Sequence, residues 1–338
     1  MTPKKTLLAA GALAGALAGG IALTGLPTAS AEPPSSCLIQ RLPVPEGSSG
    51  STVTGSGPAG APLLGHVVAE VSPLTRHLAL WRDGRVSTAE IPGGFTEAAD
   101  VNSAGLVVGN RTNAQNQPES WTYDEKGGFR VVGGGSARAV DGVGRLAGDR
   151  QAPTGNGPPV PVPVVWPAGA DAPVDLPMPG KQTGTATDIG ADGTIVGTVG
   201  TDAYVWRPDG THGPLPRPEG VPPEQALSAI RISGPWVVGG DYAPVRWNLE
   251  TGAAERVPGI ETPYGINERG WVVGETPEMG GALVADGEVL PLPTVDGGDG
   301  YTHRPAALSP DGRTIGGMAQ VRGNPSPVTE EAVVWNCS

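Results

Sequence analysis

The sequence predicts an all-β fold, a seven-bladed β-propeller whose blades are four-stranded antiparallel sheets. Three observations support this prediction. The 338 residues include 54 Gly and 37 Pro, a composition that excludes a helical protein. A hairpin motif recurs seven times, at an average spacing of about 42 residues. After each copy comes an apolar stretch that usually contains Trp. Four strands in about 42 residues is the size of one propeller blade.

The first 31 residues have the pattern of a secretory signal peptide. Lys4 and Lys5 precede an apolar run over residues 7–23, and the small residues 29–31 (Ala-Ser-Ala) form a cleavage pattern. A transmembrane anchor is the alternative, but Gly interrupts the run and no charged flank follows it. We therefore expect a secreted, extracellular protein that is cleaved after Ala31 and has no membrane anchor.

The chain is acidic, with a formal net charge of −12 that becomes −14 when the two leader lysines are removed. Beyond the leader only Lys126 and Lys181 remain as lysines, and no run of Arg occurs. The basic surface of a nucleic-acid binder is therefore missing. Net charge also keeps an exported protein soluble, so it does not by itself indicate a cationic partner.

The recurring motif reads as strand, turn, strand. Its two most regular copies are residues 99–109 (ADVNSAGLVVG) and 265–274 (GINERGWVVG). In the first copy Asn102 can cap its own turn, and Gly105 supplies the positive φ of a tight hairpin. Small residues precede each turn and suit innermost strands that crowd a central channel. Each copy closes on a glycine, namely Gly65, Gly109, Gly148, Gly197, Gly239, Gly274 and Gly316.

The third and fourth strands follow from the segments between these hairpins. The third carries a Trp that we expect to pack between blades, with Val284 in its place once. The fourth often ends in Leu-Pro or Val-Pro, as at 176–177, 215–216, 257–258 and 290–291. The expected blades are residues 51–93, 94–135, 136–183, 184–224, 225–260, 261–302, and 303–338 completed by 37–43, which make one domain over 37–338.

The two cysteines test whether the ring closes. The last copy lacks a fourth strand, whereas residues 37–43 end in Leu-Pro before any first strand appears. Counted across the termini, the third-strand Trp lies 32 positions before the next closing glycine, inside the interior range of 27–33. We therefore expect Cys37 and Cys337 to form a disulfide at this seam, as export permits. Two free or intermolecular thiols are the alternative.

The hairpin Ile-Asn-x-x-Gly-x-Val-Val-Gly at residues 266–274 and the strand Ala-x-x-Trp at 203–206 and 332–335 resemble the bacterial extracellular HAF-repeat family. The resemblance covers nearly all of the chain after the leader. It implies a secreted, propeller-like repeat protein and carries over no catalytic residue. The His-Ala-Phe triplet of the family is not kept; the nearest match is His77-Leu78-Ala79.

No catalytic or metal motif stands out. The four His residues have no metal-ligand spacing, and the Asp-Gly pairs are typical of turns, since they lack the alternating carboxylates of a calcium loop. The sequence has neither a nucleophile elbow nor a phosphate-binding loop in a strand-to-helix context. We expect no metal site and no cofactor.

Length variation lies in the connections from second to third strand and between blades, which emerge on the same end of a propeller. That end is the expected binding face. Its longest loops are expected at 149–161, 216–225, 294–304 and 319–331. Candidate ligand-binding residues near it are Arg111, Asp149, Arg150, Tyr242, Glu275, Tyr301, His303, Arg304 and Arg322.

The sequence favours a monomeric, non-catalytic module that binds an extracellular glycan, small molecule or protein. One alternative is a propeller lyase or glycan-processing enzyme, for which His303, Tyr301 and Arg304 would have to converge with Glu275 or Asp149 in a deep polar pocket. The other is a structural protein of the cell envelope.

Overall fold

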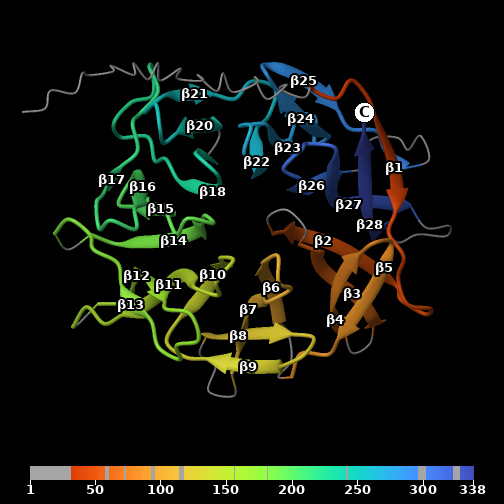
Figure 1. Ribbon diagram of the computed structural model, residues 1–338, viewed down its shortest axis with the longest axis horizontal. Helices are drawn as coiled ribbons and strands as arrows, with labels where there is room; N and C mark the ends of the chain where they lie inside the picture. The colour runs from red at the N-terminus through yellow and green to blue at the C-terminus, as the bar shows by residue number, and fades with distance from the viewer. Residues whose placement is uncertain are drawn as a thin grey trace, which may run out of the picture. The chain divides into compact units, whose positions relative to one another are not determined.

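Seven four-stranded antiparallel sheets stand in a ring (Figure 1). The computed structural model describes residues 32–57, 61–71, 74–92, 96–113, 118–155, 157–180, 182–240, 243–295, 302–322 and 328–338. The ring belongs to the unit Pro33–Ser338. The all-β, seven-bladed prediction is confirmed. No helix among the described residues is long and apolar enough to cross a membrane.

The sheets follow the chain in order. Blade 1 contains β2 (Gly50–Ser56), β3 (Leu63–Val71), β4 (Leu74–Arg82) and β5 (Arg85–Ala89). Blade 2 contains β6 (Thr96–Val101), β7 (Val107–Thr112), β8 (Pro118–Asp124) and β9 (Gly128–Val132). Blade 3 contains β10 (Ser136–Val140), β11 (Leu146–Ala152), β12 (Val160–Trp166) and β13 (Val174–Asp175). Blade 4 contains β14 (Gly184–Ile189), β15 (Ile195–Val199), β16 (Asp202–Trp206) and β17 (His212–Pro214).

The last three blades repeat the pattern. Blade 5 contains β18 (Ala229–Ser233), β19 (Trp236–Gly239), β20 (Val245–Asn248) and β21 (Ala254–Arg256). Blade 6 contains β22 (Thr262–Ile266), β23 (Val272–Glu275), β24 (Gly281–Ala285) and β25 (Glu288–Pro291). Blade 7 contains β26 (His303–Leu308), β27 (Thr314–Arg322), β28 (Val328–Cys337) and, from the other end of the chain, β1 (Cys37–Arg41).

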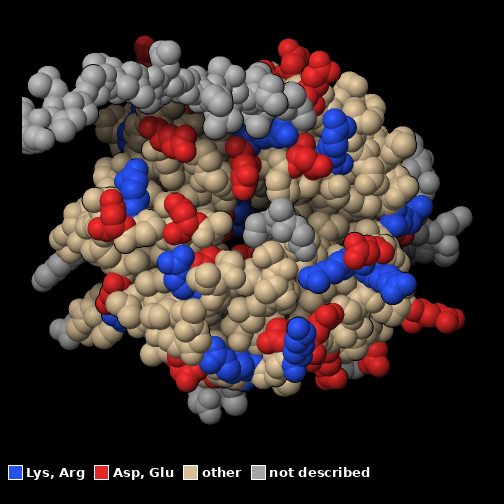
Figure 2. Space-filling view, in the orientation of Figure 1, with Lys and Arg blue, Asp and Glu red and all other residues tan. Residues whose placement is uncertain are grey.

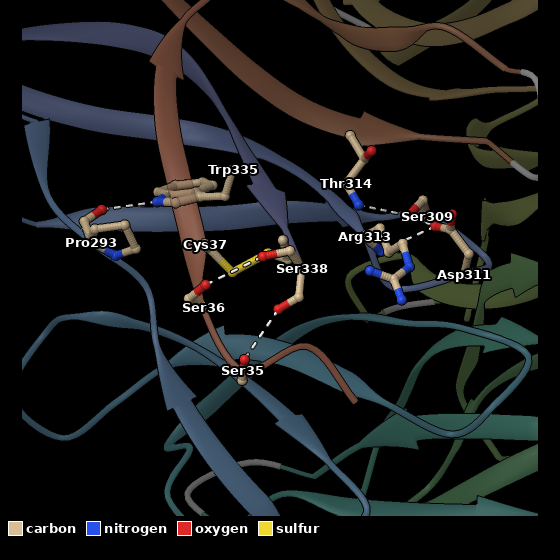
Figure 3. The surroundings of a disulfide bond; sticks show 11 residues. Ser35, Ser36, Cys37, Pro293, Ser309, Asp311, Arg313, Thr314, Trp335 and Ser338 are labelled. Carbon is tan, nitrogen blue, oxygen red and sulfur yellow. Dashed lines mark hydrogen bonds between the residues drawn. A yellow bond between two sulfur atoms is a disulfide. The ribbon is translucent and has the colours of Figure 1, made fainter. Parts of the chain in front are cut away.

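The ring closes at the predicted seam. β1 pairs antiparallel with β28, and Cys37 lies directly opposite Cys337, to which it is joined by a disulfide (Figure 3). Two backbone hydrogen bonds continue the pairing past the disulfide, from Ser35 N to Ser338 O and from Ser338 N to Ser36 O, at 2.8 and 2.9 Å. The chain termini thus replace the turn that joins third and fourth strands in the other blades.

Every first strand has a β-bulge at the same position, a feature that the sequence pattern does not reveal. The residue paired just before the bulge faces a glycine on the second strand, as Ala229 faces Gly239. A Cβ on that glycine would collide with a backbone carbonyl of the opposite chain segment, in this blade that of Ser228, the residue just before β18. In blade 7 the glycine in this position is Gly317, so the assignment of Gly316 as the closing glycine is wrong by one residue.

Buried hydrophobic residues form seven clusters, one at each junction between neighbouring blades. The third-strand Trp side chains lie in them, as predicted. Five indole Nε1–H groups also donate to a carbonyl just beyond the fourth strand of the preceding blade, at 2.7–2.9 Å. The pairs are Trp81 with Pro43, Trp166 with Gly133, Trp206 with Pro177, Trp247 with Pro216, and Trp335 with Pro293. These bonds latch five blades to their preceding neighbours, and two of the expected apolar-Pro dipeptides, 176–177 and 215–216, supply an acceptor carbonyl.

Two junctions lack the latch. Val284 replaces Trp in blade 6, and Trp236 of blade 5 packs against that cluster instead. In blade 2 Tyr123 lies at the latch slot, and the expected third-strand Trp of this blade, Trp121, lies two residues earlier, opposite Gly109. Trp121 is fully buried, but its Nε1–H has no acceptor among the described residues. The carbonyl of Pro92, beyond β5, receives a hydrogen bond from Arg111. The junction of blades 1 and 2 is therefore built differently from the others.

Candidate functional site

The two ends of the ring differ in their connections. One end, which we call the short-turn face, has the tight hairpins between first and second and between third and fourth strands. At one of these turns Asp83 and Gly84 both have positive φ, 52° and 71°. The other end, the variable face, has the second-to-third connections and the links between blades.

Two of the expected long loops on the variable face include strand. The ladder between β27 and β28 continues to the pair Arg322 and Val328, so most of residues 319–331 belongs to a hairpin. In 149–161, β11 and β12 remain paired up to Ala152 and Val160, which leaves the connection 153–159. Backbone pairing can continue beyond the ring because the antiparallel ladder satisfies its own polar groups.

A cavity of about 220 Å³ opens on the variable face where blades 7, 1 and 2 meet. It lies at the ends of β2, β3, β4, β6, β26 and β28 that point to this face. We call it the charged pocket. Its floor is formed by Leu78, Ile91 and Trp121, all buried, and its walls include His66, Arg76, Glu97, Arg304 and Glu330.

His66 shows the electrostatic character of the inner part of this pocket. Burial lowers the pKa of its imidazole to about 4, with a further contribution from the positive charge of Arg76 and a smaller opposing one from Glu330. The ring is therefore neutral at neutral pH, when it can both donate and accept a hydrogen bond. Glu330 in turn accepts a hydrogen bond from Thr52 Oγ1 at 3.0 Å.

Arg304 links the pocket to blade 6. Its guanidinium lies 5.4 Å from the centroid of the Tyr264 ring, and Tyr264 Oη donates to Glu275 Oε2 at 2.7 Å. Burial and the bond to Glu275 raise the pKa of Tyr264 to about 12. Two predicted site residues, Glu275 and Arg304, are thus brought together through a tyrosine that the sequence did not single out.

His303 is separated from this group, although it adjoins Arg304 in the chain. Its side chain is buried between blades 6 and 7, with Nε2 3.0 Å from the Leu292 carbonyl and its ring 6.2 Å from that of Trp335. Burial lowers the pKa of the imidazole. Neighbouring residues of a strand point to opposite sides, so His303 faces the blade junction and Arg304 faces the pocket.

The remaining predicted residues lie elsewhere or pair locally. Arg111 forms an ion pair with Glu119 at 2.6 Å. In blade 3 Asp149 pairs with Arg138 at 2.8 Å, and Arg150 pairs with Asp175 at 2.6 Å. None of these side chains lines the charged pocket. Tyr242 and Tyr301 lie outside the described residues, as does the side chain of Arg322.

Sequence reasoning missed His66, Arg76, Glu97 and Glu330, yet one signal was readable. One residue before the position that faces the closing glycine, five blades have Thr or Ser, whereas blades 2 and 7 have Glu97 and Arg304. A charged residue at a strand position where the other blades have Ser or Thr indicates a local function.

A second cavity, of about 110 Å³, lies at the centre of the ring toward the short-turn face, where Figure 2 shows an opening. Asp100, Asp188 and Arg231 line it. Each carboxylate accepts its own following amide and an amide of the next blade: Val140 N donates to Asp100 and Ile232 N to Asp188, both at 2.8 Å. These aspartates therefore connect blades.

Burial and the nearby Asp188 raise the pKa of Asp100 to about 7, and burial also raises the pKa of Asp188. Arg231 opposes both shifts. Among the described residues no group of three or more His, Cys, Asp or Glu side chains is arranged to hold a metal ion.

Comparison with known proteins identifies the architecture alone. No family model matches the chain, and no curated protein does. A chain of a mitotic checkpoint complex is similar with a TM-score of 0.53 at 15% identity, over 96% of this chain and 99% of that one. An oligogalacturonate lyase from Vibrio parahaemolyticus is similar with a TM-score of 0.53 at 12% identity, over 89% of this chain and 97% of that one. At such identities the likeness is one of fold.

Proposed function

We propose that this protein is an exported, non-catalytic binding module whose ligand occupies the charged pocket of the variable face. The observation that supports this function is the pocket itself, to which three blades contribute cationic, anionic and apolar side chains around one concave site. The Cys37–Cys337 disulfide is compatible with an extracellular protein, and the leader pattern supports export. Membership of the HAF-repeat family remains a prediction.

The enzyme alternative has less support from the geometry. The arrangement expected for it brings His303 together with Arg304, and His303 instead faces the core between blades 6 and 7. Asp149 is paired with Arg138 in blade 3 and does not line the charged pocket. The acid–base group that the sequence predicts for a lyase is therefore not assembled.

A binding screen of glycans and small metabolites on residues 32–338 tests the proposed function. Each hit is measured again with Glu330→Gln, which alters the charged pocket, and with Arg82→Gln, which alters the short-turn face. We expect Glu330→Gln to weaken binding at least tenfold and Arg82→Gln to leave it unchanged. Hits that respond only to Arg82→Gln, or a glycan that is shortened during the assay, would contradict the proposal.

A further inference from the structure

The charged pocket has a polarity that restricts the chemistry of its occupant. Its inner part is electropositive, because the half-buried Arg76 acts on the neutral ring of His66 there. Its rim is formed by exposed charged side chains, with the carboxylates of Glu97 of blade 2 and Glu330 of blade 7 on two sides and Arg304 of blade 7 beside them. An occupant that fits both parts carries an anionic group inward and hydrogen-bond donors around its outer edge.

The floor of the charged pocket is apolar. Leu78 and Ile91 offer aliphatic surface. Trp121, which is fully buried, lines the same cavity. The floor therefore suits an apolar face of the occupant.

The positions of the Glu97 and Glu330 carboxylates, which accept hydrogen bonds, distinguish between two kinds of small acid as the occupant of the pocket. An α-amino acid has its ammonium group on the carbon that carries the carboxylate, so its donors lie on one side. Glu97 and Glu330 belong to blades on opposite sides of blade 1, so they suit an occupant with donors around a ring. A pyranose has hydroxyl groups around its edge and C–H groups on its faces.

We propose that the charged pocket binds a hexuronic acid, with its carboxylate toward Arg76 and its hydroxyl groups toward Glu97 and Glu330. This inference rests on the proposed binding function and specifies its ligand class. The sugar is either a free monosaccharide or the end of an acidic glycan, since both present the same group to the pocket.

Calorimetric titration of residues 32–338 with D-galacturonate, D-galactose and L-alanine tests the class. We expect galacturonate to bind at least tenfold more tightly than galactose, which lacks the carboxylate, and than alanine, which lacks the ring of hydroxyl groups. Trigalacturonate, titrated in parallel, distinguishes the two sources, because a glycan end binds more tightly than the monosaccharide only when further subsites exist. Equal affinities for galacturonate and galactose, or tighter binding of alanine, overturn the proposal.

Matched variants locate the binding. Arg76→Gln is expected to weaken the binding of galacturonate at least tenfold. Arg150→Gln, the same change on the same face but outside the pocket, leaves the affinity unchanged. Glu97→Gln alters an exposed side chain, so it keeps the fold and tests the rim if Arg76→Gln fails to fold. Binding that none of the pocket variants changes overturns the assignment.

His66 provides an independent readout. A carboxylate placed beside its ring raises the pKa of the imidazole above its value of about 4, which NMR titration of the ring protons detects. Galactose, which lacks the carboxylate, leaves the pKa of His66 unchanged. If galacturonate does not bind but another compound responds to Glu330→Gln, the ligand class is wrong and the binding function stands. If no compound responds to a pocket variant, both proposals fail.

Discussion

The latch hydrogen bonds can be measured by comparing two fully buried tryptophans, only one of which forms a latch. Trp247 lies at the latch slot of the third strand of blade 5, whereas Trp121 lies two residues before that slot in blade 2, opposite Gly109. Trp247 Nε1 donates to the Pro216 carbonyl at 2.7 Å, whereas Trp121 Nε1 has no acceptor among the described residues. Replacing each with Phe removes the same atoms but breaks a hydrogen bond in only one case.

The expected difference follows from this contrast. Both variants lose similar packing, so the cavity contributions to the free energy of unfolding nearly cancel. Trp247→Phe also leaves a carbonyl without its donor, while Trp121→Phe removes a donor that had no partner; each effect is about 1–3 kcal/mol. We expect Trp247→Phe to be at least about 2 kcal/mol less stable than Trp121→Phe, a difference of at least about 4 °C in melting temperature for a chain of this size.

Urea unfolding followed by far-ultraviolet circular dichroism, with the disulfide intact, measures this difference. Trp166→Phe serves as a second test, because Trp166 Nε1 donates to the Gly133 carbonyl at 2.9 Å, and its loss of stability should match that of Trp247→Phe. The reasoning is refuted if Trp121→Phe is as destabilised as the other two within about 0.5 kcal/mol, or more so.

Three further predictions follow from the ring. A non-reducing mass map should show the Cys37–Cys337 link, and replacing both cysteines with Ser should lower the free energy of unfolding by about 2–5 kcal/mol in urea; two free thiols in the exported protein would argue against ring closure. The folded-state pKa of Asp100 is raised to about 7 from 3.8, so the folded state holds the proton more tightly and its stability should fall as pH rises from about 4 to 7. Asp100→Asn should flatten that slope in urea titrations at several pH values, and an unchanged slope would exclude this carboxylate as its source. Gly239→Ala should destabilise the protein by about 2–4 kcal/mol because its Cβ would collide with the backbone carbonyl of Ser228, whereas Gly142→Ala meets open space and should melt close to the wild type; similar melting temperatures for the two variants would contradict this.

Much of the fold was predictable because its signals are local and repeated. Asn102 Oδ1 accepts from the amides of Ala104 and Leu106 at 3.0 Å, so the cap of this turn lies within five residues. Gly105 has a φ of 85°, as the turn requires. Seven similar units allow one unit to be checked against another, and this comparison located the seam between Cys37 and Cys337 as well.

The site was predictable only in part. The variable face and two of its residues, Glu275 and Arg304, followed from loop position. The charged pocket did not, because Thr52 and Glu330 are 278 positions apart and meet only when blade 7 closes against blade 1. The placement of His303 between blades 6 and 7 was not predicted for a related reason: the side to which it points depends on the pairing of β26.

The sequence by itself determined the number of blades, the order of strands and the pairing of the two cysteines, because these depend on periodic turns and on hydrophobic strands that each unit repeats. The tertiary structure decided what differs among the blades. The missing acceptor of Trp121 and the cluster of His66, Arg76 and Arg304 arise from contacts between units. Repetition encodes the ring, whereas function depends on the places where the repeats differ and are brought together by its closure.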